Sequence, residues 1–363
     1  MLFTRSCNVK IHSLTQCSFW VTQKRDIKLK YPRNVSILCS KRRDLSMSLK
    51  IRDSNKYGLV DRLRLGSLSE DKLSYNECFI IRCYEVGINK TATIATIANL
   101  LQEIKCNHAQ ALGFSKEGFA TTPAMRKLRL IWVVTRVHIE MYRYPNWFSD
   151  VIEIETWIQP EGKIKTRRDY IIKDCANGEV IGKATSKFVM LNTDTRKLAR
   201  VGPQITDELV ILYPKELRLS SPEENNKIMR KIPKLAGPGH HSKSGLMPRR
   251  DDIDMNRHVN NVTYLRWVLE SVPQEIIDNY ELQSITLDYR QECQQDDVVD
   301  SLTSAETTDK SLSIPPLKGK NGAYSTTRND DDYGVQFLHL LKLSSNGCET
   351  NRGCSEWRRK PQK

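Results

Sequence analysis

The densest group of polar side chains precedes a helix that is expected to begin at Asn260 or Asn261. In an extended segment, residues two apart point to the same side, so Asp254, Asn256 and His258 are expected to share one face. The first turn of the helix would add free backbone N–H groups and the positive end of its dipole at the same place. An acid, an amide and an imidazole in this setting can polarise a carbonyl group and stabilise a developing oxyanion.

This cluster still needs a base or a second acid from another part of the fold. Glu292, at the end of a predicted strand, is the best candidate, and Cys293 beside it is a rival nucleophile that would use His258 as its base. The residues before the helix could instead only cap it, and the short pattern leaves both interpretations open. The sequence has no GxSxG, GxxxxGK[ST] or GxGxxG motif, so nucleotide hydrolysis and hydride transfer lack support.

Hydrophobic periodicity predicts two copies of one arrangement, a helix followed by antiparallel strands. In the first copy, apolar positions step by three and four from Ile94 to His108, which predicts a helix that closes near Gly113. In the second copy, the apolar stripe of the helix reaches Val272, and Pro273 is expected to bend it. Strands are predicted at residues 79–84, 128–141, 151–159, 166–173, 180–191, 283–289, 298–303, 335–343 and 349–357. This order of elements is typical of an α+β fold.

Two segments lack such periodicity. Residues 193–245 contain five prolines and mixed charges, which predicts a linker over the surface. Residues 306–332 contain a Pro-Pro pair, two glycines and a run of three aspartates, which predicts a mobile insertion between two strands.

The net charge of +14 is concentrated at the N-terminus, where the first 50 residues hold 11 Lys or Arg and only two acidic residues. The same stretch has seven serines and three threonines, a composition typical of an organellar transit peptide, with a disordered basic arm as the alternative. A nucleic-acid partner is not expected, because no binding motif or aromatic-interleaved basic stripe is present. No apolar run approaches the roughly 18 residues of a membrane-spanning helix, so no transmembrane span is expected.

The ten cysteines form no CxxC pair and no Cys/His cluster with the spacing of metal ligands. A structural metal site is therefore not expected. The irregular gaps between them do not indicate a disulfide framework either.

Several segments together closely resemble the plant acyl-acyl-carrier-protein thioesterase family, over about residues 65–360. They are YEVGINKTAT (residues 84–93), CNHAQ (106–110), GFATT (118–122), DMNRHVNNVTY (254–264), WVLES (267–271) and LDYRQEC (287–293). The details are similar to the oleoyl-preferring class rather than to the saturated-chain class, whose members carry an extra apolar N-terminal segment that we do not find here.

The resemblance implies a tandem hot-dog fold, in which each of two units is a long helix wrapped by an antiparallel sheet. It implies a leader at residues 1–60, a first unit at 61–192 that shapes the acyl tunnel, a linker at 193–245 and a catalytic second unit at 246–363. The implied activity is hydrolysis of long-chain acyl thioesters, oleoyl above all, on acyl carrier protein (ACP) in the plastid (chloroplast) stroma, which ends fatty acid synthesis. No metal or organic cofactor is implied, and the oligomeric state stays open, a homodimer being one alternative.

The family's catalytic positions correspond to Asp254, Asn256, His258 and Glu292. The resemblance thus implies that Asn256 and the helix N-terminus hold the thioester carbonyl. Glu292 or Asp254 would activate water, and His258 would orient that group or carry its proton. The rival mechanism, with Cys293 as the nucleophile, is less favoured because a lone cysteine is more often a packed thiol than a reactive one.

One departure from the family pattern is WFSD at residues 147–150, where family members usually read Trp-Gly-Asp. Contacts with substrate near that turn are therefore in question. Two other functions compete with hydrolysis: a hot-dog hydratase, which also pairs a histidine with a carboxylate, and a non-catalytic module that binds acyl thioesters.

A basic stretch at residues 126–173 holds ten Lys or Arg against six acidic residues. Because acyl carrier proteins are strongly acidic, this stretch predicts docking of the carrier protein by charge complementarity. An ordinary solvated sheet face is the alternative. The residues expected to take part are Arg126, Lys127, Arg129, Arg167 and Arg168.

Overall fold

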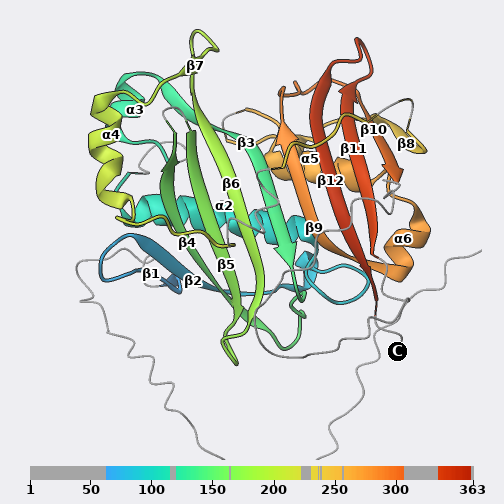
Figure 1. Cartoon of the computed structure of the whole chain (residues 1–363), viewed down its shortest axis with the longest axis horizontal. Helices are drawn as coiled ribbons and strands as arrows, with labels where there is room; N and C mark the ends of the chain where they lie inside the picture. Colours follow the sequence, from blue (N-terminus) through green and yellow to red (C-terminus); the bar gives the residue numbers. More distant parts are fainter. Residues whose placement is uncertain are drawn as a thin grey trace, which may run out of the picture. The chain divides into compact units, whose positions relative to one another are not determined.

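A computed structural model of the chain describes residues 63–114, 120–162, 165–221, 230–235, 237, 239–255, 257–305 and 334–360 (Figure 1). The predicted leader at 1–60, the predicted insertion at 306–332 and Asn256 lie outside these residues. None of the helices in the described ranges is long and apolar enough to cross a membrane.

The first half of the chain has the predicted order of a helix followed by antiparallel strands. The helix α2 (Ile94–Ala111) begins at Thr93, whose side chain accepts a hydrogen bond from the backbone N–H of Thr96. The strand predicted at 79–84 lies earlier in the chain, because Cys83–Glu85 turn in a 3-10 helix. The other elements are β1 (Gly66–Leu68), β2 (Ser74–Ile80), α3 (Pro123–Lys127), β3 (Leu130–Met141), β4 (Val151–Glu161), β5 (Lys165–Asp174) and β6 (Val180–Asn192).

The second half repeats this order with a shorter helix. The helix α5 (Asn261–Leu269) ends before Val272, and α6 (Gln274–Asn279) begins separately after Pro273. The prediction of one bent helix was therefore wrong, because proline cannot donate a backbone hydrogen bond and disfavours helical geometry in the preceding residue. The strands are β8 (His241–Leu246), β9 (Tyr280–Tyr289), β10 (Val299–Ala305), β11 (Val335–Leu343) and β12 (Glu349–Arg359).

The segment predicted as a linker contains structure of its own. The strand β7 (Leu198–Ala199) pairs with β6, and the helix α4 (Pro203–Leu209) continues into a 3-10 turn (Val210–Leu212). Apolar residues at steps of four and three, Ile205, Leu209 and Leu212, are buried against β3, β4 and β6 of the first half. This short helical period was missed among the prolines of the segment.

All the strands in the described ranges belong to one antiparallel sheet of 12 strands, in the order β1-β2-β4-β5-β6-β3-β9-β12-β11-β10-β8, with β7 on β6. The two halves join where β3 pairs with β9, from Arg136 opposite Asp288 to Glu140 opposite Ser284. Each half thus has the arrangement expected of a hot-dog unit, and the two share a continuous sheet (Figure 1).

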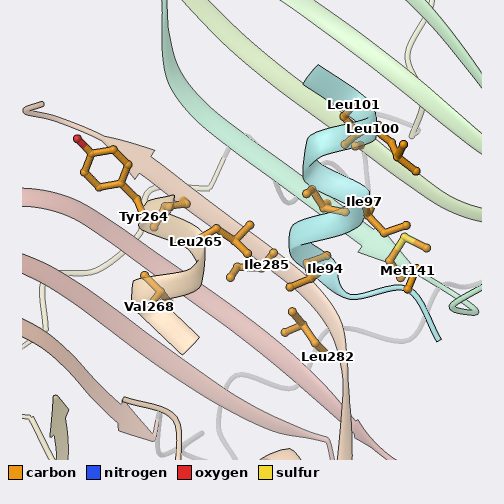
Figure 2. Packing of buried hydrophobic residues seen from close by; sticks show 14 of the residues in the cluster. Ile94, Ile97, Leu100, Leu101, Met141, Tyr264, Leu265, Val268, Leu282 and Ile285 are labelled. Carbon is orange, nitrogen blue, oxygen red and sulfur yellow. The ribbon is translucent and has the colours of Figure 1, made fainter. Parts of the chain in front are cut away.

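The hydrophobic core also crosses the boundary between the halves. Figure 2 shows Ile94 and Ile97 of α2 and Leu265 and Val268 of α5 gathered around Ile285 of β9. Each such side chain contributes about 1.5–3 kcal/mol when it is fully removed from water. The two helices are therefore fixed relative to one another, and a site between the halves can have a defined geometry.

Candidate active site

The predicted catalytic residues Asp254 and His258 lie in a loop that closes on itself. Ile253 and Val259 form an antiparallel bridge, and the backbone N–H of Asp254 donates to the carbonyl oxygen of His258 at 2.8 Å. The Oδ1 atom of Asp254 accepts a hydrogen bond from the backbone N–H of His258 at 3.1 Å. The expectation that residues 254–258 form an extended segment with alternating faces was wrong, because these hydrogen bonds turn the backbone. Asp254 braces this turn and thereby fixes the position of His258.

The helix α5 begins directly after this loop. The side-chain oxygen of Asn260 accepts a hydrogen bond from the backbone N–H of Val262 at 3.0 Å, so Asn260 is its N-cap. Capping is thus confirmed for Asn260, while His258 takes part in a different contact. Asn256, which was predicted to bind the thioester carbonyl, lies outside the described residues, and its role stays a prediction.

His258 meets Glu292 although 33 residues separate them in the chain. The Nδ1 atom of His258 lies 2.7 Å from the Oε2 atom of Glu292, and the two side chains are 32% and 37% exposed. The backbone around Glu292 is held on both sides. The N–H groups of Arg290 and Gln291 donate to the carbonyl oxygen of Thr350 at 2.9 and 3.2 Å. On the other side, the N–H of Cys293 donates to the hydroxyl of Tyr264 at 2.8 Å.

Arg196 is a member of this group that the sequence did not suggest. It lies in the turn between β6 and β7, in the first half, and its guanidinium forms an ion pair with the Oε1 atom of Glu292. Both carboxylate oxygens of Glu292 therefore have a partner, Arg196 on one side and His258 on the other. A basic side chain in a hairpin turn was the only signal of this contact in the sequence.

A pocket of about 680 Å³ opens beside these residues and is walled by both halves. Its polar part contains Asp254, His258 and Glu292. Its apolar part contains Trp132, Val134, Phe188 and Leu191 of the first half, and Tyr264 and Tyr289 of the second. The volume lies within the range of small-molecule sites, about 300–1,000 Å³, so a long apolar chain fits beside the polar group.

Cys293 does not have the surroundings of a nucleophile. Its side chain belongs to the hydrophobic core and is 2% exposed. Burial raises the pKa of the Cys293 thiol to about 11, so thiolate is scarce near neutral pH. This geometry argues against the Cys–His mechanism.

The residues predicted to dock the carrier protein differ in their exposure to solvent. Lys127 and Arg129 are exposed, and Arg129 pairs with Asp194 at 3.1 Å. Arg126 is half-buried and donates to the carbonyl oxygens of Phe114 and Thr121.

Arg167 and Arg168 lie in the interior at 5% and 6% exposure, so the prediction that they dock the carrier protein was wrong. Arg167 binds Asp169 at 2.7 Å, and Arg168 contacts the Nδ1 atom of His108 at 3.0 Å. The outer face of β5 is not solvated, because a segment from the predicted linker covers it, with the Ser220 hydroxyl donating to Asp169 at 2.7 Å.

Within the described ranges, no three His, Cys, Asp or Glu side chains gather closely enough to hold a metal ion. The group around Glu292 offers the imidazole of His258, the carboxylates of Glu292 and Asp254, and the guanidinium of Arg196. This set can activate water and stabilise charge beside an apolar chain.

The comparisons with known proteins agree with this arrangement. The model of the acyl-ACP thioesterase N-terminal domain matches residues 72–209, and that of the acyl-ACP thioesterase C-terminal domain matches residues 237–359. The chain is 61% identical to the chloroplastic oleoyl-acyl carrier protein thioesterase of Coriandrum sativum, over 84% of this chain and 82% of that protein. It is 62% identical to the chloroplastic oleoyl-acyl carrier protein thioesterase 2 of Arabidopsis thaliana, over 83% of this chain and 81% of that protein.

Among solved structures, the 12:0-ACP thioesterase from Umbellularia californica superposes with a TM-score of 0.67 at 34% identity. The superposition covers 80% of this chain and 95% of that one. The tandem hot-dog fold predicted from the sequence is therefore confirmed.

Proposed function

The chain belongs to the acyl-ACP thioesterase family and is a thioester hydrolase, and from this premise we propose that its main substrate is oleoyl-ACP. Two relatives named as oleoyl thioesterases are 61% and 62% identical, whereas a 12:0 thioesterase is 34% identical. A pocket of about 680 Å³ with an apolar wall supports a long acyl chain. The observation that supports hydrolysis at this pocket is the His258–Glu292 pair at its polar side.

In the proposed reaction, the acyl chain lies along the apolar wall and the thioester carbonyl lies near the N-terminus of α5. His258 takes a proton from water, and the water oxygen attacks the carbonyl carbon. Glu292 stays ionised, accepts a hydrogen bond from the Nδ1–H group of His258 and stabilises the imidazolium that forms. The helix N-terminus and Asn256 stabilise the oxyanion. The C–S bond then breaks, and His258 returns the proton to the thiolate of the carrier protein.

This assignment differs from the initial expectation that a carboxylate is the base. Glu292 has one oxygen on His258 and the other on Arg196, and Asp254 uses Oδ1 to brace the loop. An ion-paired carboxylate is a poor proton acceptor, because the nearby cation stabilises its ionised form. These contacts favour His258 as the base, with Glu292 orienting it.

For the carrier protein, we propose a docking face beside the pocket opening. This face would include the exposed residues Lys127 and Arg129, together with the basic residues Lys165 and Arg290 of the pocket wall. An acidic partner that approaches this face would meet a positive potential and be guided towards the pocket.

We also propose that the protein works in the plastid stroma. Both oleoyl relatives are named as chloroplastic, and the basic, acid-poor composition of the first 50 residues is typical of a transit peptide.

The test is product analysis with purified chain and oleoyl-ACP, alongside palmitoyl-ACP and stearoyl-ACP. We expect free fatty acid and free carrier thiol in equal amounts, with oleoyl-ACP giving the highest kcat/KM. An enoyl thioester made from a β-hydroxyacyl-ACP would indicate a hydratase instead. Tight binding of acyl-ACP without any release of acid would indicate a non-catalytic module.

A further inference from the structure

Arg196 lies in a rigid turn that joins the first half to the catalytic group of the second. The backbone N–H of Arg196 donates to the carbonyl oxygen of Asn192 at 2.9 Å. The backbone N–H of Asn192 donates to the carbonyl oxygen of Lys197 at 3.0 Å. The side chain of Asn192 also accepts hydrogen bonds from the N–H groups of Asp194 and Thr195. The side chain of Arg196 therefore projects from a fixed point on the wall of the pocket.

The backbone of Arg196 has an unfavourable conformation for an arginine. Its φ angle is +54°, in the left-handed region where glycine and asparagine are preferred. In hairpin turns of this kind, the left-handed position is usually a glycine. An arginine here costs stability, so its side chain is expected to have a use that glycine would not supply.

The contact that Arg196 makes is with the catalytic pair itself. Its guanidinium binds Oε1 of Glu292, while Oε2 of Glu292 lies 2.7 Å from Nδ1 of His258. The carboxylate is thus held between the two halves of the chain. A guanidinium on one oxygen favours the ionised carboxylate and leaves the other oxygen to face the imidazole.

On the basis of the proposed hydrolase function, we propose that Arg196 is a positioning residue for the reaction. It acts through Glu292, whose carboxylate it holds so that Oε2 accepts a hydrogen bond from the Nδ1–H group of His258. The active site of the second half is therefore completed by a residue of the first half. Two simpler roles compete with this one: a half-exposed ion pair without consequence, and a cation that only attracts the carrier protein.

The Arg196→Gly variant removes the side chain without destabilising the turn, because glycine readily adopts the left-handed backbone conformation. A loss of activity can therefore be told apart from a loss of folding. We expect the thermal unfolding midpoint of this variant to stay the same or rise. Its kcat for oleoyl-ACP should fall by roughly 5- to 30-fold, while KM stays within about twofold. This range is that of one charge-assisted contact weakened by its partial exposure to solvent. Arg196→Lys should recover part of the loss, since it restores the charge. Lys197→Ala, an exposed basic residue of the same turn, is the matched control and should behave as wild type.

A second comparison uses the Glu292→Gln background. If Arg196 acts through Glu292, Arg196→Gly should lower kcat by less than about twofold once the carboxylate is gone. An equal loss in both backgrounds, a rise in KM with unchanged kcat, or an unchanged kcat in the wild-type background would each overturn the proposed role. These results are distinct from failure of the function itself, which would appear as no release of oleate by the wild-type chain.

Discussion

Replacing Glu292 by glutamine removes one charge from the proposed catalytic pair, His258 and Glu292, with little change of shape. The amide oxygen of glutamine can still accept a hydrogen bond from the Nδ1–H group of His258, so the imidazole can keep its orientation. What is lost is the negative charge that stabilises the imidazolium after it takes the proton from water. The variant therefore isolates the electrostatic part of the contact between His258 and Glu292.

The size of the loss follows from the exposure of the pair. Two unit charges about 4 Å apart interact by about 4 kcal/mol at an effective dielectric constant of about 20 and by about 1 kcal/mol in water. The side chains of His258 and Glu292 are 32% and 37% exposed, so an intermediate value applies. A loss of roughly 1.5–3 kcal/mol corresponds to a fall in kcat of roughly 10- to 150-fold.

The assay is the steady-state release of free thiol from oleoyl-ACP. We expect kcat to fall by the amount given above, with KM within about threefold of wild type, because the charge acts on the transition state rather than on binding. Glu270→Gln, an exposed residue at the end of α5, controls for general loss of an acidic side chain. A Glu292→Gln variant with at least half of the wild-type kcat would refute this reasoning, as would a loss confined to KM.

Three further predictions concern other parts of the chain. Cys293→Ala should keep kcat within about threefold but lower the free energy of unfolding by about 1–2 kcal/mol, because it leaves a small cavity in the core; loss of turnover in a folded variant would restore the thiol as nucleophile. The double variant Lys127→Glu and Arg129→Glu should raise KM for the carrier protein by roughly 3- to 10-fold and weaken the dependence of KM on salt, with kcat unchanged. An unchanged KM would show that the carrier protein docks on another face. Burial lowers the pKa of His339 to about 3. Below about pH 6.5 the imidazole is therefore protonated in the unfolded chain but stays neutral in the folded chain. The free energy of unfolding should fall by up to about 5 kcal/mol as pH drops from about 6.5 towards 3. Urea titrations at stepped pH should show a weaker dependence for His339→Gln, and parallel curves for the two proteins would contradict this.

Local patterns were enough to predict most of the elements. The steps of three and four from Ile94 to His108 predicted α2, and its buried face matches them. The prediction failed where a single residue decides the outcome, as at Pro273, which separates α5 from α6. It also failed for Ile205, Leu209 and Leu212, whose short period is obscured by nearby prolines.

Long-range contacts could not be predicted from such patterns. Nothing in the sequence of β3 specifies that its free edge pairs with β9, because strand partners are chosen by the whole fold. Arg167 was predicted at the surface because the segment that covers its face of β5 arrives from around Ser220. Arg168 is on the opposite face, where it contacts His108 of α2, a contact that the strand alone does not reveal. The proposed catalytic pair was predicted both from the residue pattern and from the family resemblance, whereas Arg196 lies 96 residues before Glu292 and was missed.

In the proposed mechanism, water activated by His258 and Glu292 attacks the thioester directly. The most direct test is a rapid-quench single turnover of oleoyl-ACP by wild type and by Cys293→Ala, followed by intact-mass analysis of the enzyme. We expect both proteins to release oleate at rates within about threefold of each other, and neither to gain the mass of an acyl group. An acylated wild-type enzyme that forms and decays in step with product, together with an inactive Cys293→Ala, would contradict it.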